Sequence, residues 1–559
     1  MAIPVLAAER GMNSRLKIGH LILMFAFVAL PFAASFALYY PDERHYTDGA
    51  LMMQKHGNWL MPQNADGTLR FQKPPLAYWS VAASYAIFGS GVLASRLPFL
   101  LASCGTLWLT YRAGRRLTGN AETALLAAVV LLSHPQFFLC SVRSMPDALL
   151  AFFITLSAYG FLRLIVFEEF AAGALWAAYG GAAGAVLSKG LLGAVIVLFA
   201  WTFAFGRERH WRAVKKIIHL PGLAAAIILA GSWFGYIYWK QGTGALNVFF
   251  DDQVTGNFHG HWWSPFGRAP LFALILIFNF LPWSATAGEW LLRKKQGAAG
   301  NVPLLAQKFI LAWMALLIAG FALGEDVSLR YLLPGTPLLA VLLADWLRSA
   351  EQMRLIFSTR LILKIVLDAL VLAIAAAFFI DTQWPLPAVL MALTCGFFLF
   401  GVVVLGLGAF WRNAFSAAEA LGLAILLGWV IFFAAAMPML LPDRAQQIAA
   451  TLWQTQPDPA QPVLFVGDVK LASRVRVLLG KNWTVAQTSM LNMTTAANYT
   501  RVLIPEKEIR PFLGSGWRIQ TAAVGLGVPT RGELWTALKS RRLPEALSRH
   551  AKKIYLATR

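Results

Sequence analysis

The stretch IGHLILMFAFVALPFAASFALYYPDERHY, residues 18–46, joins a long apolar segment directly to a pair of carboxylates. Its apolar part, 18–39, is long enough to cross a hydrocarbon core about 30 Å thick. It is too long for the apolar region of a secretory signal, and no small-residue cleavage site follows it, so we expect a retained first span. The pair Asp42 and Glu43 is therefore predicted to lie at a membrane surface.

The composition extends this prediction to most of the chain. Of its 559 residues 58% are hydrophobic and only 13% are charged, too few charges for the surface of a soluble protein of this size. We predict an all-α polytopic membrane bundle over residues 1–441, with about thirteen spans. The predicted spans are 18–39, 92–111, 121–140, 147–167, 171–187, 190–206, 218–238, 270–291, 307–323, 332–347, 361–380, 386–411 and 416–440.

Basic residues between the spans predict the orientation. The formal net charge is +21, and the Lys and Arg clusters in alternate loops fall on the side of the N-terminus. Cytoplasmic loops of membrane proteins are enriched in Lys and Arg, so that side is predicted to be cytoplasmic, and nucleic acid is not expected as a partner. The opposite side, in a bacterium the periplasm, then holds the long first loop, 40–91.

The first loop has helical patterns of its own. Residues Thr47–Asn58 predict one short helix, and Pro74–Phe88 predict a second that begins at a Pro pair. Both are expected to lie on the membrane surface.

Residues 442–559 differ in composition from the rest of the chain. Strand-like runs at 462–466, 483–486 and 501–504 alternate with helical stretches, which predicts a C-terminal periplasmic α/β domain. This segment has 17 Lys and Arg against 7 Asp and Glu. An anionic partner such as lipid phosphates would explain the excess, and a generally basic composition would explain it equally well.

Three carboxylates are the candidate catalytic residues: Asp42, Glu43 and Asp147. Each also has an ordinary interpretation, since carboxylates at helix ends are commonly solvated or stabilised by the helix dipole. The predicted topology places all three on the outer side. Charges at the rim of a membrane bundle usually serve a function.

Cations and tyrosines on the same side are the candidate phosphate-binding residues. Alternatively, the lysines extend to the lipid head groups or cap tight turns, and the tyrosines belong to an interfacial aromatic belt. The candidates are Lys73, Tyr78, Arg143, Lys189, Arg330 and Tyr331.

His259 and His261 are weak candidates for a metal site. Two histidines two residues apart fall short of a recognisable ligand pattern, and Trp262 and Trp263 favour an interfacial aromatic loop instead.

Four short motifs carry a resemblance to a known family. They are RFQKPPLAYW at 70–79, RSMPD at 143–147, SKG at 188–190 and RYLLP at 330–334. Together with the carboxylate pair after the first span, they make the chain resemble integral-membrane GT-C glycosyltransferases of the protein O-mannosyltransferase-like group. Within that group the pattern is most similar to the bacterial lipid A 4-amino-4-deoxy-L-arabinose transferases.

The resemblance implies a function. A transferase of this kind would move 4-amino-4-deoxy-L-arabinose from an undecaprenyl-phosphate donor to a lipid A phosphate, on the periplasmic face of the inner membrane, giving polymyxin resistance. Asp42 would be the main catalytic residue, with Glu43 and Asp147 as its partners. Lys73, Lys189 and Arg330 would neutralise the departing phosphate. Direct displacement would invert the anomeric centre; a divalent metal is possible, and we expect a monomer.

Three other functions remain open from the sequence. A related polyprenyl-phosphate glycosyltransferase would use another sugar, or a protein or glycan acceptor. A lipid-linked sugar transporter would show inverted repeats and broken helices at mid-membrane, which the sequence does not suggest. A non-catalytic membrane scaffold would leave the clustered charges without a purpose.

Overall fold

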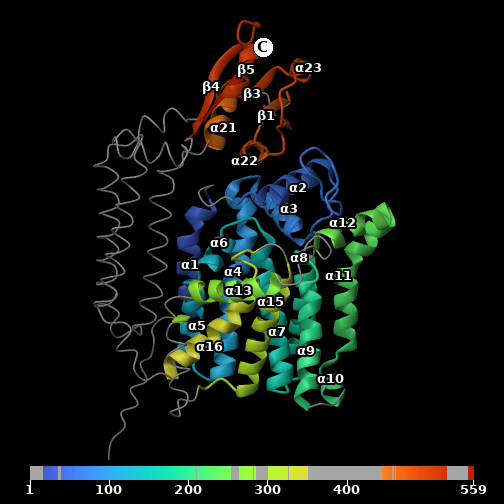
Figure 1. Cartoon of the computed structure of the whole chain (residues 1–559), viewed down its shortest axis with the longest axis vertical. Helices are drawn as coiled ribbons and strands as arrows, with labels where there is room; N and C mark the ends of the chain where they lie inside the picture. The colour runs from blue at the N-terminus through green and yellow to red at the C-terminus, as the bar shows by residue number, and fades with distance from the viewer. Residues whose placement is uncertain are drawn as a thin grey trace, which may run out of the picture.

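The computed structural model describes a mostly helical body with a five-stranded sheet at one end (Figure 1). The predicted spans 361–380, 386–411 and 416–440 lie outside the described residues. The described residues are 17–34, 40–208, 211–253, 264–280, 283–284, 300–324, 327–349, 444–455, 459, 461–525 and 552–559.

The helices of the body follow the predicted spans for most of the described length. The short helices α10 and α12 were not predicted, and α13 begins at Ser264, before the predicted start of the span 270–291, although its apolar part runs from Arg268 to Asn279. The body helices are α1 (Ile18–Ala33), α4 (Val92–Thr118), α5 (Ala121–Leu132), α6 (Pro135–Ser141), α7 (Pro146–Val166), α8 (Ala172–Lys189), α9 (Leu192–Glu208), α10 (Trp211–Ile217), α11 (Leu220–Gln241), α12 (Thr243–Gln253), α13 (Ser264–Asn279), α15 (Leu304–Leu323) and α16 (Thr336–Ser349), with a 3₁₀ turn η4 (Leu333–Gly335) before α16.

Several of these helices have the length and the apolar composition of membrane-spanning segments. Within the described residues, α4, α7, α11 and α15 are long and apolar enough to cross a bilayer. The predicted span 121–140 is divided into α5 and α6, which meet at an angle of 73° and would make a fifth crossing if they form one span. Pro135 disfavours helical geometry at His134, whose ring accepts a hydrogen bond from the Phe137 amide and so begins α6 afresh.

Helices α7 and α8 form a closely packed antiparallel pair. Gly160 and Gly181 make the contact possible, since an added Cβ at Gly160 would lie 2.3 Å from the Ala178 backbone nitrogen. The pairing brings the start of α7 beside the end of α8, which decides where the charged side chains at these two helix ends meet.

The first loop folds into the two predicted short helices. They are α2 (Glu43–His56) and α3 (Leu76–Phe88), and α3 begins directly after Pro74 and Pro75. One face of α2 packs on α3 and the starts of α4 and α7 through a separate apolar cluster that includes Tyr46 and Tyr78. The loop is therefore an ordered cover on one end of the helical body.

The C-terminal residues form a mixed sheet in the order β2-β1-β3-β5-β4. Strands β1, β2 and β3 run parallel; β1 and β3 match the predicted runs 462–466 and 501–504 within a residue, and β2 begins two residues after the start of the run 483–486. The unpredicted β5 pairs antiparallel with β3 and with β4, which was also not predicted. Its elements are α21 (Arg444–Thr455), β1 (Val463–Val466), α22 (Val469–Leu479), β2 (Val485–Thr488), α23 (Met493–Ala496), β3 (Arg501–Pro505), β4 (Arg518–Gly525) and β5 (Lys552–Thr558), with 3₁₀ turns η6 (Glu506–Glu508) and η7 (Arg510–Phe512).

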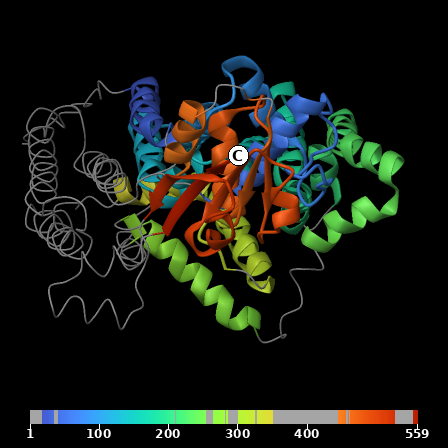
Figure 2. The same cartoon turned by 90° about the horizontal axis from the view of Figure 1, so that it is seen from above.

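The sheet and its helices, here called the C-terminal sheet unit, lie over the first loop. Figure 1 places α22 above α2 and α3, and Figure 2, seen from above, shows the sheet unit in front of the helical body. The contact includes a buried ion pair in which Arg476 on α22 donates to the Asp48 carboxylate on α2 at 2.8 Å and 3.1 Å. Helix α2 is thus held between the helical body and the sheet unit.

Candidate active site

Four charged residues from distant parts of the sequence meet at the end of the helical body covered by the first loop. The Lys189 ammonium donates to Asp147 Oδ1 at 2.6 Å, and the Arg330 guanidinium lies 3.7 Å from Asp147 Oδ2. Arg330 also donates to Asp42 Oδ2 at 3.4 Å. We call Asp42, Asp147, Lys189 and Arg330 the ion cluster.

Local structure explains why these side chains meet. Asp147 lies in the first turn of α7, which begins at Pro146, and Lys189 is the last residue of α8. The helix dipoles favour a carboxylate at the first position and a cation at the second. Arg330 is in the turn before η4, which packs on α7, and Asp42 is the residue that precedes α2.

The ion cluster combines a buried and an open carboxylate. The Asp147 side chain is 3% exposed and that of Asp42 is 49% exposed. Asp147 Oδ2 and Arg330 Nε are both buried and, among the described residues, neither makes a hydrogen bond. The two atoms face each other at 3.7 Å, which is an ion-pair distance too long for a hydrogen bond.

Aromatic rings and a further arginine surround Arg330. Its guanidinium lies 4.5 Å from the centre of the Tyr40 ring, and that of Arg143 lies 5.3 Å from the same ring. The Lys189 ammonium lies 5.3 Å from the Tyr331 ring. Burial, the largest single cause, works to lower the pKa of Arg330, but Asp147 and Tyr40 together outweigh it, so the pKa is raised and Arg330 stays charged. Burial lowers the pKa of Arg143.

Glu43, the neighbour of Asp42, is engaged in a different way. Its side chain is 2% exposed and forms a two-point ion pair with the fully buried Arg96 at 2.9 Å and 3.0 Å. It also accepts from the backbone amides of Tyr40 at 2.7 Å and Ser144 at 2.8 Å. Arg96 in turn donates to the Phe32 carbonyl. We call Glu43, Arg96 and Ser144 the Glu43 clamp, which joins α1, α2, α4 and the turn before α7.

Tyr78 lies between α2 and the rest of the first loop. It is fully buried, its hydroxyl accepts from Arg70 Nε at 3.1 Å, and its ring lies 5.0 Å from that of Tyr46. Burial raises the pKa of Tyr46 well above its ordinary value, and Tyr78, Asp147 and Asp42 raise it further. Tyr46 therefore stays protonated within electrostatic reach of both carboxylates of the ion cluster.

Lys73 is half-buried beside α2. Together with Arg70 and Arg44 it lowers the pKa of His45 to about 3, burial being the largest cause. Lys73 thus lies within electrostatic reach of α2, on the side where His45 is found.

One residue of this region, Arg96, was not predicted from the sequence, and two predicted candidates lie outside the described residues. Arg96 was not singled out, although an arginine inside the apolar run of α4 is itself a signal of a buried partner. His259 and His261 lie outside the described residues. Within those residues, no group of three or more His, Cys, Asp or Glu side chains is arranged to hold a metal ion.

Comparison with known proteins shows the family. Residues 72–236 match the family model described as dolichyl-phosphate-mannose-protein mannosyltransferase, a range that includes Asp147 and Lys189. The chain is 31% identical over 361 residues to an uncharacterized protein of Aquifex aeolicus (strain VF5), covering 64% of this chain and 69% of the relative. The chain belongs to this family of membrane GT-C glycosyltransferases.

Two other similarities are more distant. The glycosyltransferase is 26% identical to an undecaprenyl phosphate-alpha-4-amino-4-deoxy-L-arabinose arabinosyl transferase of Pseudomonas fluorescens (strain Pf0-1), over 62% of this chain and only 61% of that relative. It has the fold of ArnT from Cupriavidus metallidurans, solved with bound undecaprenyl phosphate. That match has a TM-score of 0.69 at 16% identity and covers 97% of this chain and 98% of the other.

Proposed function

We propose that this glycosyltransferase transfers 4-amino-4-deoxy-L-arabinose from undecaprenyl phosphate to a phosphate of lipid A, and so confers resistance to polymyxin. The arabinosyl transferase relatives and the ArnT fold support the donor. The single observation that carries the proposal is the ion cluster, in which Arg330 lies between the carboxylates of Asp42 and Asp147.

The cations of the site suit a phosphate leaving group. The bond between the sugar C1 and the donor phosphate oxygen breaks, and the electron pair leaves with that oxygen. Arg143, Lys189 and Arg330 carry three positive charges against the two carboxylates of the ion cluster, so a net positive charge remains to stabilise the departing phosphate.

Asp42 is the carboxylate we assign to the reacting centre. An acceptor phosphate is already ionised at neutral pH, so its oxygen attacks C1 without a strong base and the configuration inverts. The open Asp42 carboxylate would stabilise the positive charge that develops at the sugar or bind its amine. We assign positioning roles to Asp147, which holds Lys189 and Arg330, and to Glu43, whose oxygens are all engaged.

The proposed function also implies a location and an orientation of the protein in the membrane. We propose a multi-pass inner-membrane protein with about thirteen spans in residues 1–441, a cytoplasmic N-terminus, and an active site and a soluble 442–559 domain in the periplasm. We further propose that the protein acts as a monomer. The apolar helices of the body and the position of the sheet unit over the first loop support this placement.

The test of the reaction is mass spectrometry of lipid A from strains with and without the gene, followed by transfer with the purified protein and a synthetic donor. We expect a mass increment equal to the amino sugar only when the gene is present. An increment equal to another sugar, or modification of a protein in place of lipid A, would replace the proposed substrate pair.

The placement is tested separately by single cysteines labelled with a membrane-impermeant reagent. Cysteines introduced at Asp66 and Lys507 should be labelled from the periplasm, and one introduced at Arg115 should not. Labelling of all three from one side would contradict the proposed orientation.

A further inference from the structure

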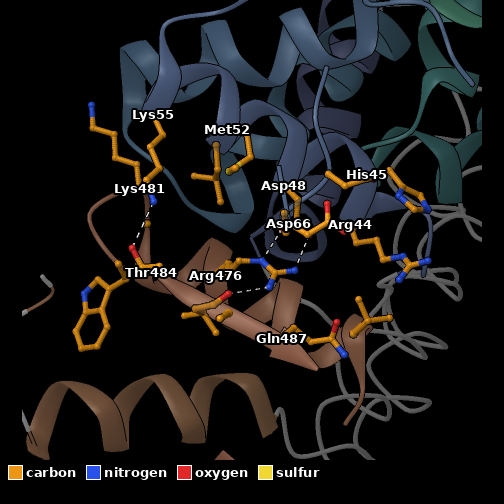
Figure 3. Close-up of a pocket in the computed structure, with 18 of the residues that line it drawn as sticks. Arg44, His45, Asp48, Met52, Lys55, Asp66, Arg476, Lys481, Thr484 and Gln487 are labelled. Atoms are coloured by element: carbon orange, nitrogen blue, oxygen red, sulfur yellow. Dashed lines mark hydrogen bonds and ion pairs between the residues drawn. The ribbon is translucent and has the colours of Figure 1, made fainter. Parts of the chain in front are cut away.

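A cavity of about 610 Å³ lies between α2, the loop 64–70 and the C-terminal sheet unit (Figure 3). The sheet unit contributes Val469 and Arg476 of α22 and most of residues 480–487. We call this cavity the basic cleft. Two contacts between α2 and the sheet unit lie at the cleft: the buried Asp48–Arg476 ion pair and an exposed hydrogen bond from Lys55 to Thr484 at 3.3 Å.

The basic cleft has an excess of positive charge. Its lining includes Arg44, Lys55, Arg70, Arg476 and Lys481 against two aspartates, a net charge of +3. Asp48 is engaged by Arg476, and Asp66 by the backbone amide and hydroxyl of Thr68. Among the described residues no ion pair involves Arg44, Lys55, Arg70 or Lys481, and the buried Nε of Arg44 makes no hydrogen bond.

His45 on the wall of the cleft reports the same positive field. Burial, Arg70, Arg44 and Lys73, in that order, hold the pKa of its imidazole at about 3, so the ring is neutral at physiological pH. Lys73, although it does not line the cavity, thus adds to the field around it. Lys55 and Lys481 lie at one end of the cleft and Arg44 at the other, with Asp48, Asp66 and Arg476 between them (Figure 3).

Helix α2 places the basic cleft close to the ion cluster. Its residues Arg44, Asp48 and Lys55 face the cleft, whereas Glu43 and Tyr46 face the helical body. The Arg44 end of the cleft is therefore about 10 Å, one helix diameter, from the ion cluster, and the Lys55 end is roughly 20 Å along the helix from Asp42. Arg70 connects them, since it lines the cleft and donates to the Tyr78 hydroxyl next to Tyr46.

We propose that the basic cleft binds a second, non-reacting phosphate of the acceptor while another phosphate of the same head group receives the sugar at the ion cluster. This inference rests on the proposed function, because it takes lipid A, which carries more than one phosphate, as the acceptor. Phosphomonoesters are dianions that pair well with arginine and lysine. The distance across α2 from the Arg44 end of the cleft to the ion cluster suits a head group with phosphates at both ends of a disaccharide.

The test compares bisphosphoryl with monophosphoryl lipid A as acceptors for the purified full-length protein in nanodiscs. We expect the wild type to favour the bisphosphoryl form by about tenfold in kcat/KM, through the acceptor KM. The double variant Arg44→Gln/Lys481→Gln should lose this preference and keep the donor KM. The single variant Lys481→Gln, which changes only an exposed side chain, should lose part of it and guards against misfolding of the double variant.

The matched control is Lys507→Gln/Arg510→Gln, which removes the same charges from exposed positions of the sheet unit outside the cleft. It should keep the full preference. Equal loss in the control, or an unchanged preference in both cleft variants, would overturn the proposal.

Equilibrium binding of the two lipids, measured without donor, separates this inference from the proposed function. Tighter binding of bisphosphoryl lipid A that is lost in the cleft variants supports the inference even if no sugar is transferred. A soluble glucosamine disaccharide bisphosphate that binds as tightly as the lipid, with the same loss, would assign the cleft to a soluble phosphate ester and overturn the acceptor assignment.

Discussion

Asp42 and Glu43 are neighbours in the sequence, yet they belong to two regions with opposite properties. Glu43 is buried, and donors from Arg96, Tyr40 and Ser144 occupy its carboxylate. Asp42 is half exposed, and its described side-chain contact is a long one, 3.4 Å from Arg330. The Glu43 clamp is closed and fully satisfied, whereas the ion cluster is open and only partly satisfied.

We infer from this difference that the Glu43 clamp stabilises the structure of the site, whereas the ion cluster interacts with the substrate. A buried ion pair with complete hydrogen bonding cannot take up a substrate without losing the contacts that offset its desolvation. An exposed carboxylate with one long contact to an arginine can take up a substrate without such a loss. Two adjacent carboxylates should therefore fail in different ways when they are replaced.

The largest effect is expected from Glu43→Ala. Removing Glu43 leaves Arg96 charged and fully buried without its carboxylate, which costs about 4 kcal/mol in the free energy of unfolding. Thermal unfolding of the protein in detergent would show a clear fall in Tm, with activity lost together with the fold. An unchanged Tm would mean that the clamp does not hold the first loop, and Glu43 would then be a candidate for direct catalysis.

The next effect is expected from Asp42→Asn. The substitution keeps the shape but removes the charge, and we expect kcat to fall at least a hundredfold, equivalent to about 2.7 kcal/mol of transition-state stabilisation. Thermal unfolding should be nearly unchanged, because Asp42 is exposed and weakly paired. Normal turnover by this variant would remove Asp42 from the mechanism, and a large fall in Tm would make it part of the clamp.

A smaller effect is expected from Lys73→Ala. Lys73 lies beside α2 and contributes to the positive field around His45. If it also attracts the donor phosphate, its removal should raise the donor KM by about tenfold and leave kcat within a few-fold of the wild type. Arg510→Ala, an exposed substitution on the sheet unit, is the control. A rise in the acceptor KM alone would instead place Lys73 with the basic cleft.

Much of the architecture could be predicted from the sequence because its signals are local. The helix after the Pro pair at 74–75 begins at Leu76, and the apolar run at 462–466 becomes β1. Apolar length predicted the body helices, but it did not predict the break at His134 and Pro135, which depends on a local cap. Strand β5 was missed because its pairing with β3 joins residues far apart in the chain.

The candidate site could be predicted only in part, for a similar reason. Asp147, Lys189 and Arg330 stand out as charges at the ends of apolar segments, and predicted topology puts them on one side. Which carboxylate is closed and which is open depends on Arg96, whose contact with Glu43 spans 53 residues. No pattern around Asp42 and Glu43 tells them apart, because burial is decided by the helix that packs against them.

The smallest effect is expected from Lys55→Ala. It tests whether the contrast between buried, fully hydrogen-bonded ion pairs and exposed polar contacts also holds at the contact between α2 and the sheet unit. Lys55 donates to Thr484 at 3.3 Å in an exposed contact between α2 and the sheet unit, on the same helix as the buried Asp48–Arg476 pair. Exposed polar contacts contribute little because water competes for both partners, so the free energy of unfolding should change by less than about 1 kcal/mol. The variant Asp48→Ala, measured in the same unfolding experiment, should lose several times more, because it leaves Arg476 buried without its partner. Equal losses would mean that the sheet unit is held by the whole surface of α2. Burial of an ion pair would then not distinguish the residues that stabilise this protein from those that act on its substrate.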